Sequence, residues 1–224
     1  AFVLDMDGTV FLSDRLLPGA LDILLYFQER QIPYLFLTNN SSKHKRLYAE
    51  KLQRLGLPVQ PEKIFTSGEA TAQYLQQTQK HIRRIFLCGT PALEEEFQQY
   101  GYQLEEHPPQ AVVLGFDTTL SYAKLWKLCD HIRNGLPYYA THADVNCPLA
   151  EGVMPDIGAM IAFVQASTGR LPDEVIGKPN PPVVAALQAR LGLAREQICM
   201  VGDRLYTDIA LGKAGLKTVL VLSG

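Results

Sequence analysis

Short apolar runs alternate with amphipathic stretches in the first third of this chain. Residues 2–7 (FVLDMD) and 32–39 (IPYLFLTN) are typical of strands, and the second run is unbroken, as in parallel strands buried on both faces. Leucines between positions 17 and 25 recur at helical spacing, and so do Tyr48, Leu52 and Leu55. A strand at 64–68 and a helix at 69–79 follow. This βαβα order predicts a parallel sheet covered by helices.

The same rhythm restarts near residue 80. Strands are predicted at 83–89, 111–116 and 137–142, and Leu125, Leu128, Cys129 and Ile132 mark a helix. After residue 178 the pattern predicts a helix over 183–191, a strand at 197–203, a helix near 207–214 and a strand at 218–223. One parallel sheet, interrupted by an inserted second unit, accounts for this order.

Composition narrows the class of protein. The 224 residues are 47% hydrophobic and 20% charged, as in an ordinary globular protein. A net charge of −2 gives no basic field for nucleic acid, and no apolar run approaches the roughly 18 residues of a membrane span. The four cysteines are far apart without a C-x-x-C pair, and two lie inside apolar runs. Reduced thiols and a cytoplasmic location are therefore expected.

Two aspartates end the first apolar run. Asp5 and Asp7 would lie roughly 7 Å apart on one side of an extended strand, where like charges raise each other's pKa. A metal or catalytic site would explain such a pair. Asp7 and Gly8 also form a good two-residue turn signal, with "TVFL" as the returning strand of a hairpin. On these residues alone both interpretations stay open.

Polar residues also follow the strand at 32–39. Thr38 and Asn39 end this run, and Asn40 leads into the next helix. A hydroxyl beside free backbone N–H groups at a helix N-terminus is a common anion site. Simple N-capping of the helix is the alternative.

The last third of the chain supplies two more carboxylates and a lysine. Asp203 and Asp208 follow the strand at 197–203, although a Gly-Asp turn and a helix start would also place them there. Lys178 lies in "GKPNPP", where a lone loop lysine is ordinarily solvated surface.

Together these groups indicate one site. Ligands of open parallel sheets bind beyond the carboxyl ends of the strands, so all these side chains are expected at one edge. Converging carboxylates need a divalent cation, and an all-oxygen set without His or Cys suits Mg²⁺. A lysine and a helix N-terminus suit a phosphate. A carboxylate beside both is positioned to attack the phosphoryl group and form an aspartyl-phosphate.

The segments "DMDGTV", "LTNN", "GKP" and "GDRLYTD" resemble, in order, the four motifs of the haloacid dehalogenase superfamily of phosphohydrolases. The stretch between Asp7 and Thr38 is too short for a cap domain, whereas that between Thr38 and Lys178 is ample. With "ATHADVNCPLAEG", this spacing resembles the subfamily of NagD, 4-nitrophenylphosphatase and phosphoglycolate phosphatase. The resemblance implies a doubly wound, Rossmann-like α/β core at 1–78 and 172–224, with an α/β cap of the C2 type at 79–171.

The resemblance also implies roles for single residues. Asp5 would be the nucleophile and a metal ligand, and Asp7 the general acid and base, with its backbone carbonyl on the metal. Thr38, Asn39 and Asn40 would hold the phosphate, together with a further residue, Lys178. The remaining metal ligands would be Asp203 and Asp208.

The loop at 142–151 and Asp156 beyond it, together called the cap loop, give weaker indications. Asp144, Asn146, Cys147 and Asp156 are candidates for leaving-group specificity, and Asp156 stands where relatives often have glycine. Asp144, Glu151 and Asp156 would make an acidic cap face that disfavours strongly anionic leaving groups. A merely solvated loop is the alternative for each residue taken singly.

The sequence thus predicts a Mg²⁺-dependent phosphomonoesterase that acts on a small phosphorylated metabolite, of the sugar phosphate, nucleotide monophosphate, phosphoglycolate or p-nitrophenyl phosphate type. There are two alternatives. One is an enzyme that transfers the phosphoryl group to an acceptor other than water, and the other is a regulatory protein that binds phosphate without turnover. No nucleic acid or membrane partner is expected, and the resemblance leaves room for a homodimer formed through the cap.

Overall fold

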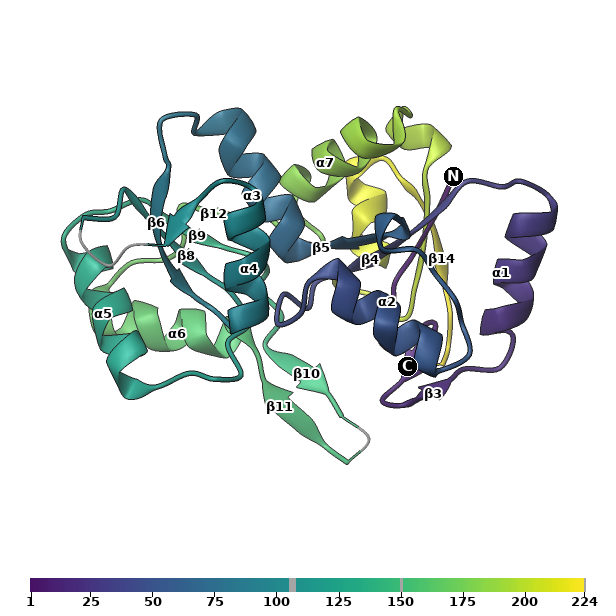
Figure 1. The fold of residues 1–224 in the computed structure, drawn as a ribbon, viewed down its shortest axis with the longest axis horizontal. Coiled ribbons are helices and arrows are strands. Elements are labelled where there is room, and N and C mark those ends of the chain that lie inside the picture. Colours follow the sequence, from purple (N-terminus) through teal and green to yellow (C-terminus); the bar gives the residue numbers. More distant parts are fainter. Residues whose placement is uncertain (105–107, 150, 224) are drawn as a thin grey trace.

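The computed structural model describes residues 1–104, 108–149 and 151–223, which form two five-stranded sheets side by side along the long axis (Figure 1). Every strand pairing within the two sheets is parallel. The first sheet has the order β14–β13–β1–β4–β5. Its strands are β1 (Phe2–Leu4), β4 (Tyr34–Thr38), β5 (Ile64–Thr66), β13 (Cys199–Gly202) and β14 (Lys217–Leu220). This arrangement confirms the predicted α/β class with a parallel sheet.

The first sheet is covered on both faces because alternate strand residues point to opposite sides. In β4, Leu35 and Leu37 join the cluster packed under α3 and α7, whereas Tyr34 and Phe36 face α1 and α2. All five residues of β4 are buried, as its unbroken apolar run predicts. These helices are α1 (Ala20–Glu29), α2 (Lys45–Arg54), α3 (Ser67–Thr78) and α7 (Pro181–Leu191).

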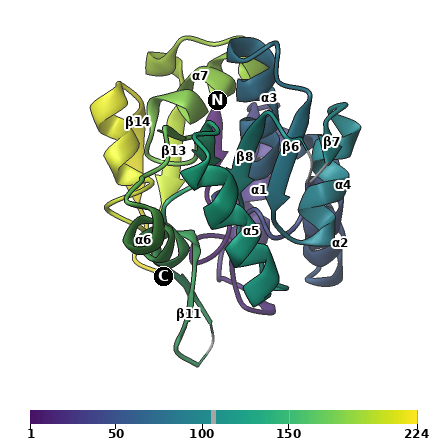
Figure 2. The same ribbon diagram turned by 90° about the vertical axis from the view of Figure 1, so that its left-hand side faces the viewer.

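The second sheet has the order β12–β9–β8–β6–β7. Its strands are β6 (Arg84–Cys88), β7 (Gln103–Leu104), β8 (Ala111–Leu114), β9 (Tyr138–Ala140) and β12 (Glu174–Val175). One face packs against α3 and α4 (Pro91–Gln99), and the other against α5 (Tyr122–Arg133) and α6 (Ile157–Thr168). In the end-on view α5 and α6 lie nearest the viewer (Figure 2).

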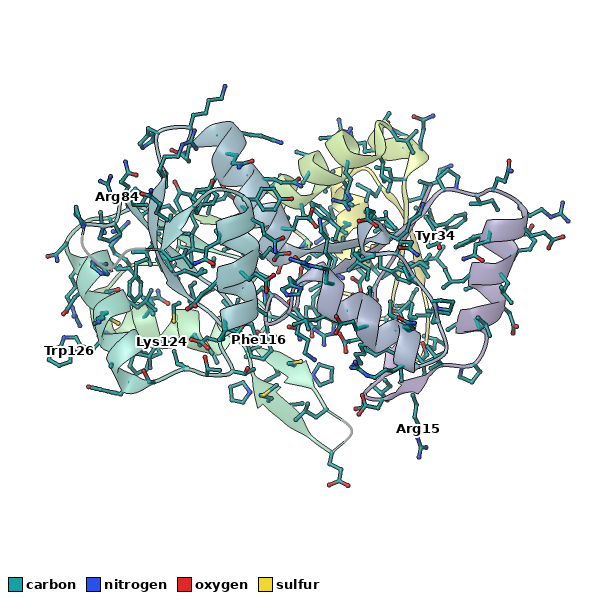
Figure 3. All side chains as sticks on the ribbon, viewed as in Figure 1. Arg15, Tyr34, Arg84, Phe116, Lys124 and Trp126 are labelled. Carbon is teal, nitrogen blue, oxygen red and sulfur yellow. The ribbon has the colours of Figure 1, made fainter. Side chains whose placement is uncertain are left out.

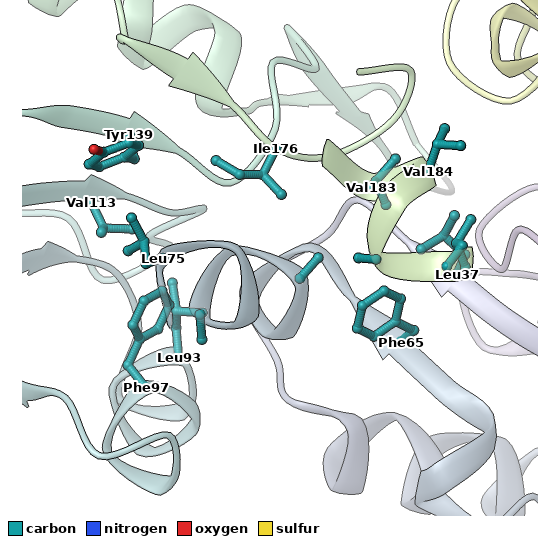
Figure 4. Packing of buried hydrophobic residues seen from close by; sticks show 14 of the residues in the cluster. Leu37, Phe65, Leu75, Leu93, Phe97, Val113, Tyr139, Ile176, Val183 and Val184 are labelled. Carbon is teal, nitrogen blue, oxygen red and sulfur yellow. The ribbon is translucent and has the colours of Figure 1, made fainter. Parts of the chain in front are cut away.

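One apolar cluster runs through both sheets. Leu37 and Phe65 of the first sheet and Val113 and Tyr139 of the second belong to it, with α3 and α7 between them (Figure 4). The inserted unit is therefore packed against the first sheet rather than only tethered to it. Because β12 pairs with β9, the second sheet continues to Val175, past the predicted boundary at residue 171. The division into two domains stays a prediction.

Several elements differ from the expectations. No element is predicted over α4 or α6; α6 is apolar on nearly all sides, so its sequence lacks a helical period. The helix expected near 207–214 is a 3₁₀ helix, η3 (Ile209–Ala214), and two shorter ones are η1 (Pro61–Lys63) and η2 (Arg195–Gln197). The hairpin interpretation of Asp7–Gly8 is wrong, because the chain after Gly8 does not pair back on β1. Instead β2 (Phe11–Leu12) pairs with β3 (Arg15–Leu16).

A second hairpin projects between the two sheets (Figure 1). It is formed by β10 (Asn146–Pro148) and β11 (Val153–Pro155), and it places the cap loop beside the carboxyl ends of the first sheet. Among the described residues, no helix has the length and apolarity to cross a membrane.

Candidate active site

The carboxyl edge of the first sheet holds a pocket. Its walls include Asp5, Asp7, Thr38 and Lys178 from the first sheet and its loops, and Asp144 and Asp156 from the cap loop. Asp5 directly follows β1, the central strand, so it lies between the ends of β13 and β4. The structure thus brings together groups that lie far apart in the sequence.

Lys178 is a buried member of this site and not a solvated loop residue. It is 3% exposed, and its Nζ lies 2.5 Å from Asp5 Oδ1 and 2.7 Å from Asp208 Oδ1. A third hydrogen bond, of 3.3 Å, goes to the Leu37 carbonyl. The ammonium group therefore uses all three of its donors.

Three carboxylates converge beside the lysine. One oxygen each of Asp5, Asp203 and Asp208 lies within 4.8 Å of the others. Asp203 accepts a hydrogen bond from the Thr9 hydroxyl at 3.2 Å, and Asp208 accepts one from the Arg204 backbone N–H at 3.1 Å. All the donor atoms are oxygens, a set that matches the ligands preferred by a hard divalent cation.

Two glycines permit this convergence. Gly8 has φ 91°, and a Cβ there would lie 2.5 Å from Asp203 Oδ2. A Cβ on Gly202 would overlap the carboxylate of Asp208. Any larger residue at either position would displace one of the acidic side chains.

Burial sets the protonation of the central pair. It raises the pKa of Asp5 to about 8, because the Lys178 ammonium offsets only part of the cost and Asp208 adds repulsion. Burial also disfavours the charged form of Lys178, but Asp208 and Asp5 more than compensate and hold its pKa above the ordinary value. For Asp7, too, burial raises the pKa, and Lys51 and Lys43 oppose the rise. The lysine therefore stays charged, and further positive charge nearby would favour the ionised form of Asp5.

Thr38 and Asn40 form the polar end of β4. The Asn40 N–H donates to Thr38 Oγ1 at 3.1 Å, and the Thr38 hydroxyl is also hydrogen-bonded to the Tyr48 side chain. Asn40 Oδ1 accepts from the Ser42 N–H at 3.0 Å and the Ser42 hydroxyl at 2.6 Å. This turn leads into α2, whose N-cap is His44.

The Asn39 side chain holds the Lys178 loop. Its Oδ1 accepts from the Lys178 N–H at 2.8 Å, and its Nδ2 donates to the Lys178 carbonyl at 3.0 Å. The same Nδ2 donates to Asp144 Oδ1 at 3.2 Å. Asn39 therefore links the lysine to the cap loop, a role that the sequence analysis does not predict.

The cap candidates fall into two groups. Asp144, Cys147 and Asp156 line the pocket, whereas Asn146 is exposed and does not, and Glu151 is exposed. Asp156 Oδ1 lies 3.0 Å from His142 Nε2 and accepts the Ile157 N–H at 2.6 Å. The pocket-lining aspartates are thus paired and not solvated.

Two pocket-lining residues, Arg204 and Thr207, are not predicted from the sequence. Each belongs to the segment "GDRLYTD". In this segment a site role is predicted for the two aspartates but not for the arginine between them. The sequence also does not predict a role for Ser67, whose hydroxyl donates a short hydrogen bond to the Asn39 carbonyl. A serine at the start of a helix gives no sign in the sequence that it supports a neighbouring loop.

Comparison with known proteins identifies the family. A family model described as haloacid dehalogenase-like hydrolase matches residues 2–103, and a HAD-hydrolase-like model matches residues 175–224. An acid sugar phosphatase of Staphylococcus aureus is 34% identical over 227 residues, covering 100% of this chain and 86% of the relative.

Two solved structures extend the comparison. The 4-nitrophenylphosphatase of Thermotoga maritima is 48% identical with a TM-score of 0.96, covering 100% of this chain and 85% of the other. A glycerol phosphate phosphatase of Mycobacterium tuberculosis, solved in complex with magnesium, is 33% identical with a TM-score of 0.89, covering 100% and 67%.

The chain therefore belongs to the haloacid dehalogenase-like hydrolases, as an enzyme of their phosphatase group. The resemblance seen in the four sequence segments is confirmed, and so is the similarity to the 4-nitrophenylphosphatase group.

Proposed function

We propose that this enzyme hydrolyses phosphomonoesters of small metabolites, with Mg²⁺ as cofactor and an aspartyl-phosphate as intermediate. The single observation that carries the proposal is the cluster of Asp5, Asp203, Asp208 and Lys178, of which Asp5 and Lys178 line the pocket. The names of the relatives, an acid sugar phosphatase and a 4-nitrophenylphosphatase, support sugar phosphates and nitrophenyl phosphate as substrates.

In this proposal Asp5 is the nucleophile. Its carboxylate attacks phosphorus, and the bond from phosphorus to the ester oxygen breaks. Thr38 and the backbone of the residues after it hold the phosphoryl oxygens, together with Lys178. Asp7 gives a proton to the departing alkoxide and then takes one from the water that hydrolyses the acyl phosphate. Inorganic phosphate and free Asp5 result.

The carboxylates fit a divalent cation. Asp5, Asp203 and Asp208 would hold it, and the backbone carbonyl of Asp7 is the further ligand expected from the family resemblance. When bound, such a cation neutralises the carboxylates and the charge that develops on the phosphoryl oxygens. The relative solved with magnesium supports Mg²⁺ as the particular ion.

Steady-state hydrolysis of p-nitrophenyl phosphate tests the proposal. We expect turnover with Mg²⁺, loss of activity in EDTA, recovery on adding Mg²⁺, and release of one inorganic phosphate per nitrophenolate. A panel of phosphorylated metabolites then ranks the substrates. Absence of Mg²⁺-dependent turnover with every phosphoester would reject the function, and phosphate appearing on an added alcohol instead of in solution would favour the transferase alternative.

The compartment and the partners of the enzyme are part of the same proposal. The four cysteines are free thiols, which supports a reducing compartment such as the cytoplasm. The proposed partner is a small phosphorylated metabolite, and a homodimer through the cap is a further proposal that sedimentation of the purified protein tests directly.

A further inference from the structure

Arg204 places a second cation in the pocket. Its Nη1 donates to Asp144 Oδ2 at 3.2 Å, and the two side chains are only 18% and 9% exposed. Its backbone N–H is held by Asp208, so the base of the side chain is fixed beside the acidic cluster. This ion pair joins the loop after β13 to the cap loop, across the pocket that both residues line.

The two pocket cations differ in their free donors. Lys178 uses its three donors on Asp5, Asp208 and the Leu37 carbonyl. A guanidinium group carries five N–H donors in a fork that matches a carboxylate. Among the contacts of the described residues, Arg204 uses one of them, toward Asp144. Arg204 therefore keeps donors for a ligand, but its charge is already compensated.

The two cap aspartates also differ. Asp144 accepts from Asn39 through Oδ1 and from Arg204 through Oδ2, so it neutralises a cation of the first unit. Asp156 instead contacts His142 and its own helix start. Both carboxylates lie in the same pocket, but only Asp144 controls whether the Arg204 charge is available.

We propose that Asp144 is a specificity-determining residue, which masks Arg204 and thereby excludes carboxylate-bearing leaving groups in favour of uncharged, hydroxyl-bearing ones. A carboxylate on the substrate has to compete with Asp144 for the guanidinium group and is repelled by Asp144 itself. A hydroxyl can accept one of the spare N–H donors and donate to Asp144. The inference rests on the proposed phosphatase function and names the substrate class of that site.

Glycerol 3-phosphate and 3-phosphoglycerate test the proposal, because they differ only in a terminal CH₂OH against a carboxylate. The wild-type enzyme should hydrolyse glycerol 3-phosphate with the higher kcat/KM. Asp144→Asn keeps the size of the side chain and an oxygen that can accept from Asn39, but it removes the charge. This variant should raise the ratio of kcat/KM for 3-phosphoglycerate over glycerol 3-phosphate by about 10-fold to 100-fold, the value of one charged hydrogen bond.

Two further variants show whether Arg204 is responsible. Arg204→Gln should shift the ratio the opposite way, since it leaves the charge of Asp144 without its cation while the Asn39 hydrogen bond remains. It also keeps the test open if Asp144→Asn does not fold. Asp156→Asn removes an equal charge from the same pocket and should move the ratio by less than about 3-fold, as expected for a carboxylate that does not mask the arginine.

Other results would overturn the proposal. Equal losses on both substrates in Asp144→Asn would make Asp144 only a structural link between cap and core. An equal shift in Asp156→Asn would assign the selectivity to general acidity of the cap, and a wild-type preference for 3-phosphoglycerate would exclude the mask. Failure of the proposed function is distinct, because the wild-type enzyme would then turn over no phosphoester.

Discussion

Each sheet carries an aspartate–lysine pair with a buried carboxylate near the end of its central strand. In the first sheet Asp5 follows β1 and lies 2.5 Å from Lys178 Nζ. In the second sheet Asp117 follows β8 and lies 2.8 Å from Lys124 Nζ. Lys124 and Phe116, beside Asp117 in the chain, are both marked in Figure 3. The two pairs have similar distances between nitrogen and oxygen, but their surroundings differ.

The carboxylate of Asp117 is closed off by its own loop. Its Oδ1 accepts from the Thr119 N–H at 2.8 Å and the Thr119 hydroxyl at 2.6 Å, while Lys124 covers Oδ2 and also reaches the Gly89 carbonyl. Asp5 has no such loop bond among the described contacts, and it opens on the pocket with two further carboxylates nearby. A buried ion pair at a strand end is therefore a structural clamp unless its carboxylate keeps free lone pairs beside a cavity.

The largest contrast is expected when each aspartate is neutralised. Asp5→Asn should lower kcat for p-nitrophenyl phosphate by at least about 10³-fold, because an amide cannot form the aspartyl-phosphate. Its thermal stability should stay close to wild type, since the carboxylates repel each other without metal. Asp117→Asn is the matched control: it should keep turnover and lose about 1–3 kcal/mol of unfolding free energy. Near-normal turnover in Asp5→Asn would show that another group attacks.

Asp7 sharpens the comparison, because it stands two positions after Asp5 just as Thr119 stands two positions after Asp117. The Thr119 hydroxyl donates a hydrogen bond to Asp117, whereas Asp7, in the part of the chain that the structure describes, does not contact Asp5 in this way and lines the pocket. Asp7→Asn should slow hydrolysis of an alkyl phosphate by about 10²–10⁴-fold, because the alkoxide needs a proton. The first step with p-nitrophenyl phosphate should suffer less and give a burst of nitrophenolate before a slow steady state. Rapid-quench kinetics measure both, and equal losses without a burst would make Asp7 a turn residue.

Glu96 shows a third outcome, a buried carboxyl without an ion pair among the described residues. Burial and then Glu69 raise its pKa from an ordinary 4.5 to about 8, and the Thr66 hydroxyl, which donates to it, offsets only part of the rise. Folded Glu96 therefore keeps a proton that the unfolded chain releases. Its contribution to stability is complete below pH 4.5 and is lost as the pH rises to about 8.

Denaturant unfolding across this range tests the assignment. The contribution of Glu96 should fall by up to about 1.4 kcal/mol per pH unit, and Glu96→Gln should abolish that slope. Glu95→Gln, at an exposed position on the same helix, should preserve it. An unchanged slope in Glu96→Gln would mean that Glu96 is ionised in the folded protein.

The smallest effect concerns the glycines near Asp208. Neither Gly202 nor Gly212 has a positive φ, but a methyl group on Gly202 would overlap the Asp208 carboxylate, while one on Gly212 would meet Thr218 at an ordinary 3.5 Å. Gly202→Ala should cost about 1–3 kcal/mol of unfolding free energy and raise the Mg²⁺ concentration needed for half-maximal activity. Gly212→Ala should change neither, and a neutral Gly202→Ala would show that Asp208 moves freely.

The sequence by itself determined the strand ends and the residue types found there. The apolar runs at 2–7 and 32–39 located two central strands, and the parallel arrangement alone requires their carboxyl ends to meet at one edge. Asp5, Asp7, Thr38, Lys178, Asp203 and Asp208 could therefore be expected at one edge of the sheet. Local pattern could not locate α6, whose apolar sequence has no period, or join β12 to the second sheet.

Only the tertiary structure decided which charges face each other. The distance in sequence from Asn39 to Lys178, or from Asp144 to Arg204, leaves no local signal, because a pairing across two loops depends on how two sheets pack. The same holds for the shared apolar cluster, in which α3 and α7 pack together with residues of both sheets. Neighbouring residues determine where a strand forms and which side chains end it. The Asp144–Arg204 ion pair instead joins side chains that meet only in the folded chain.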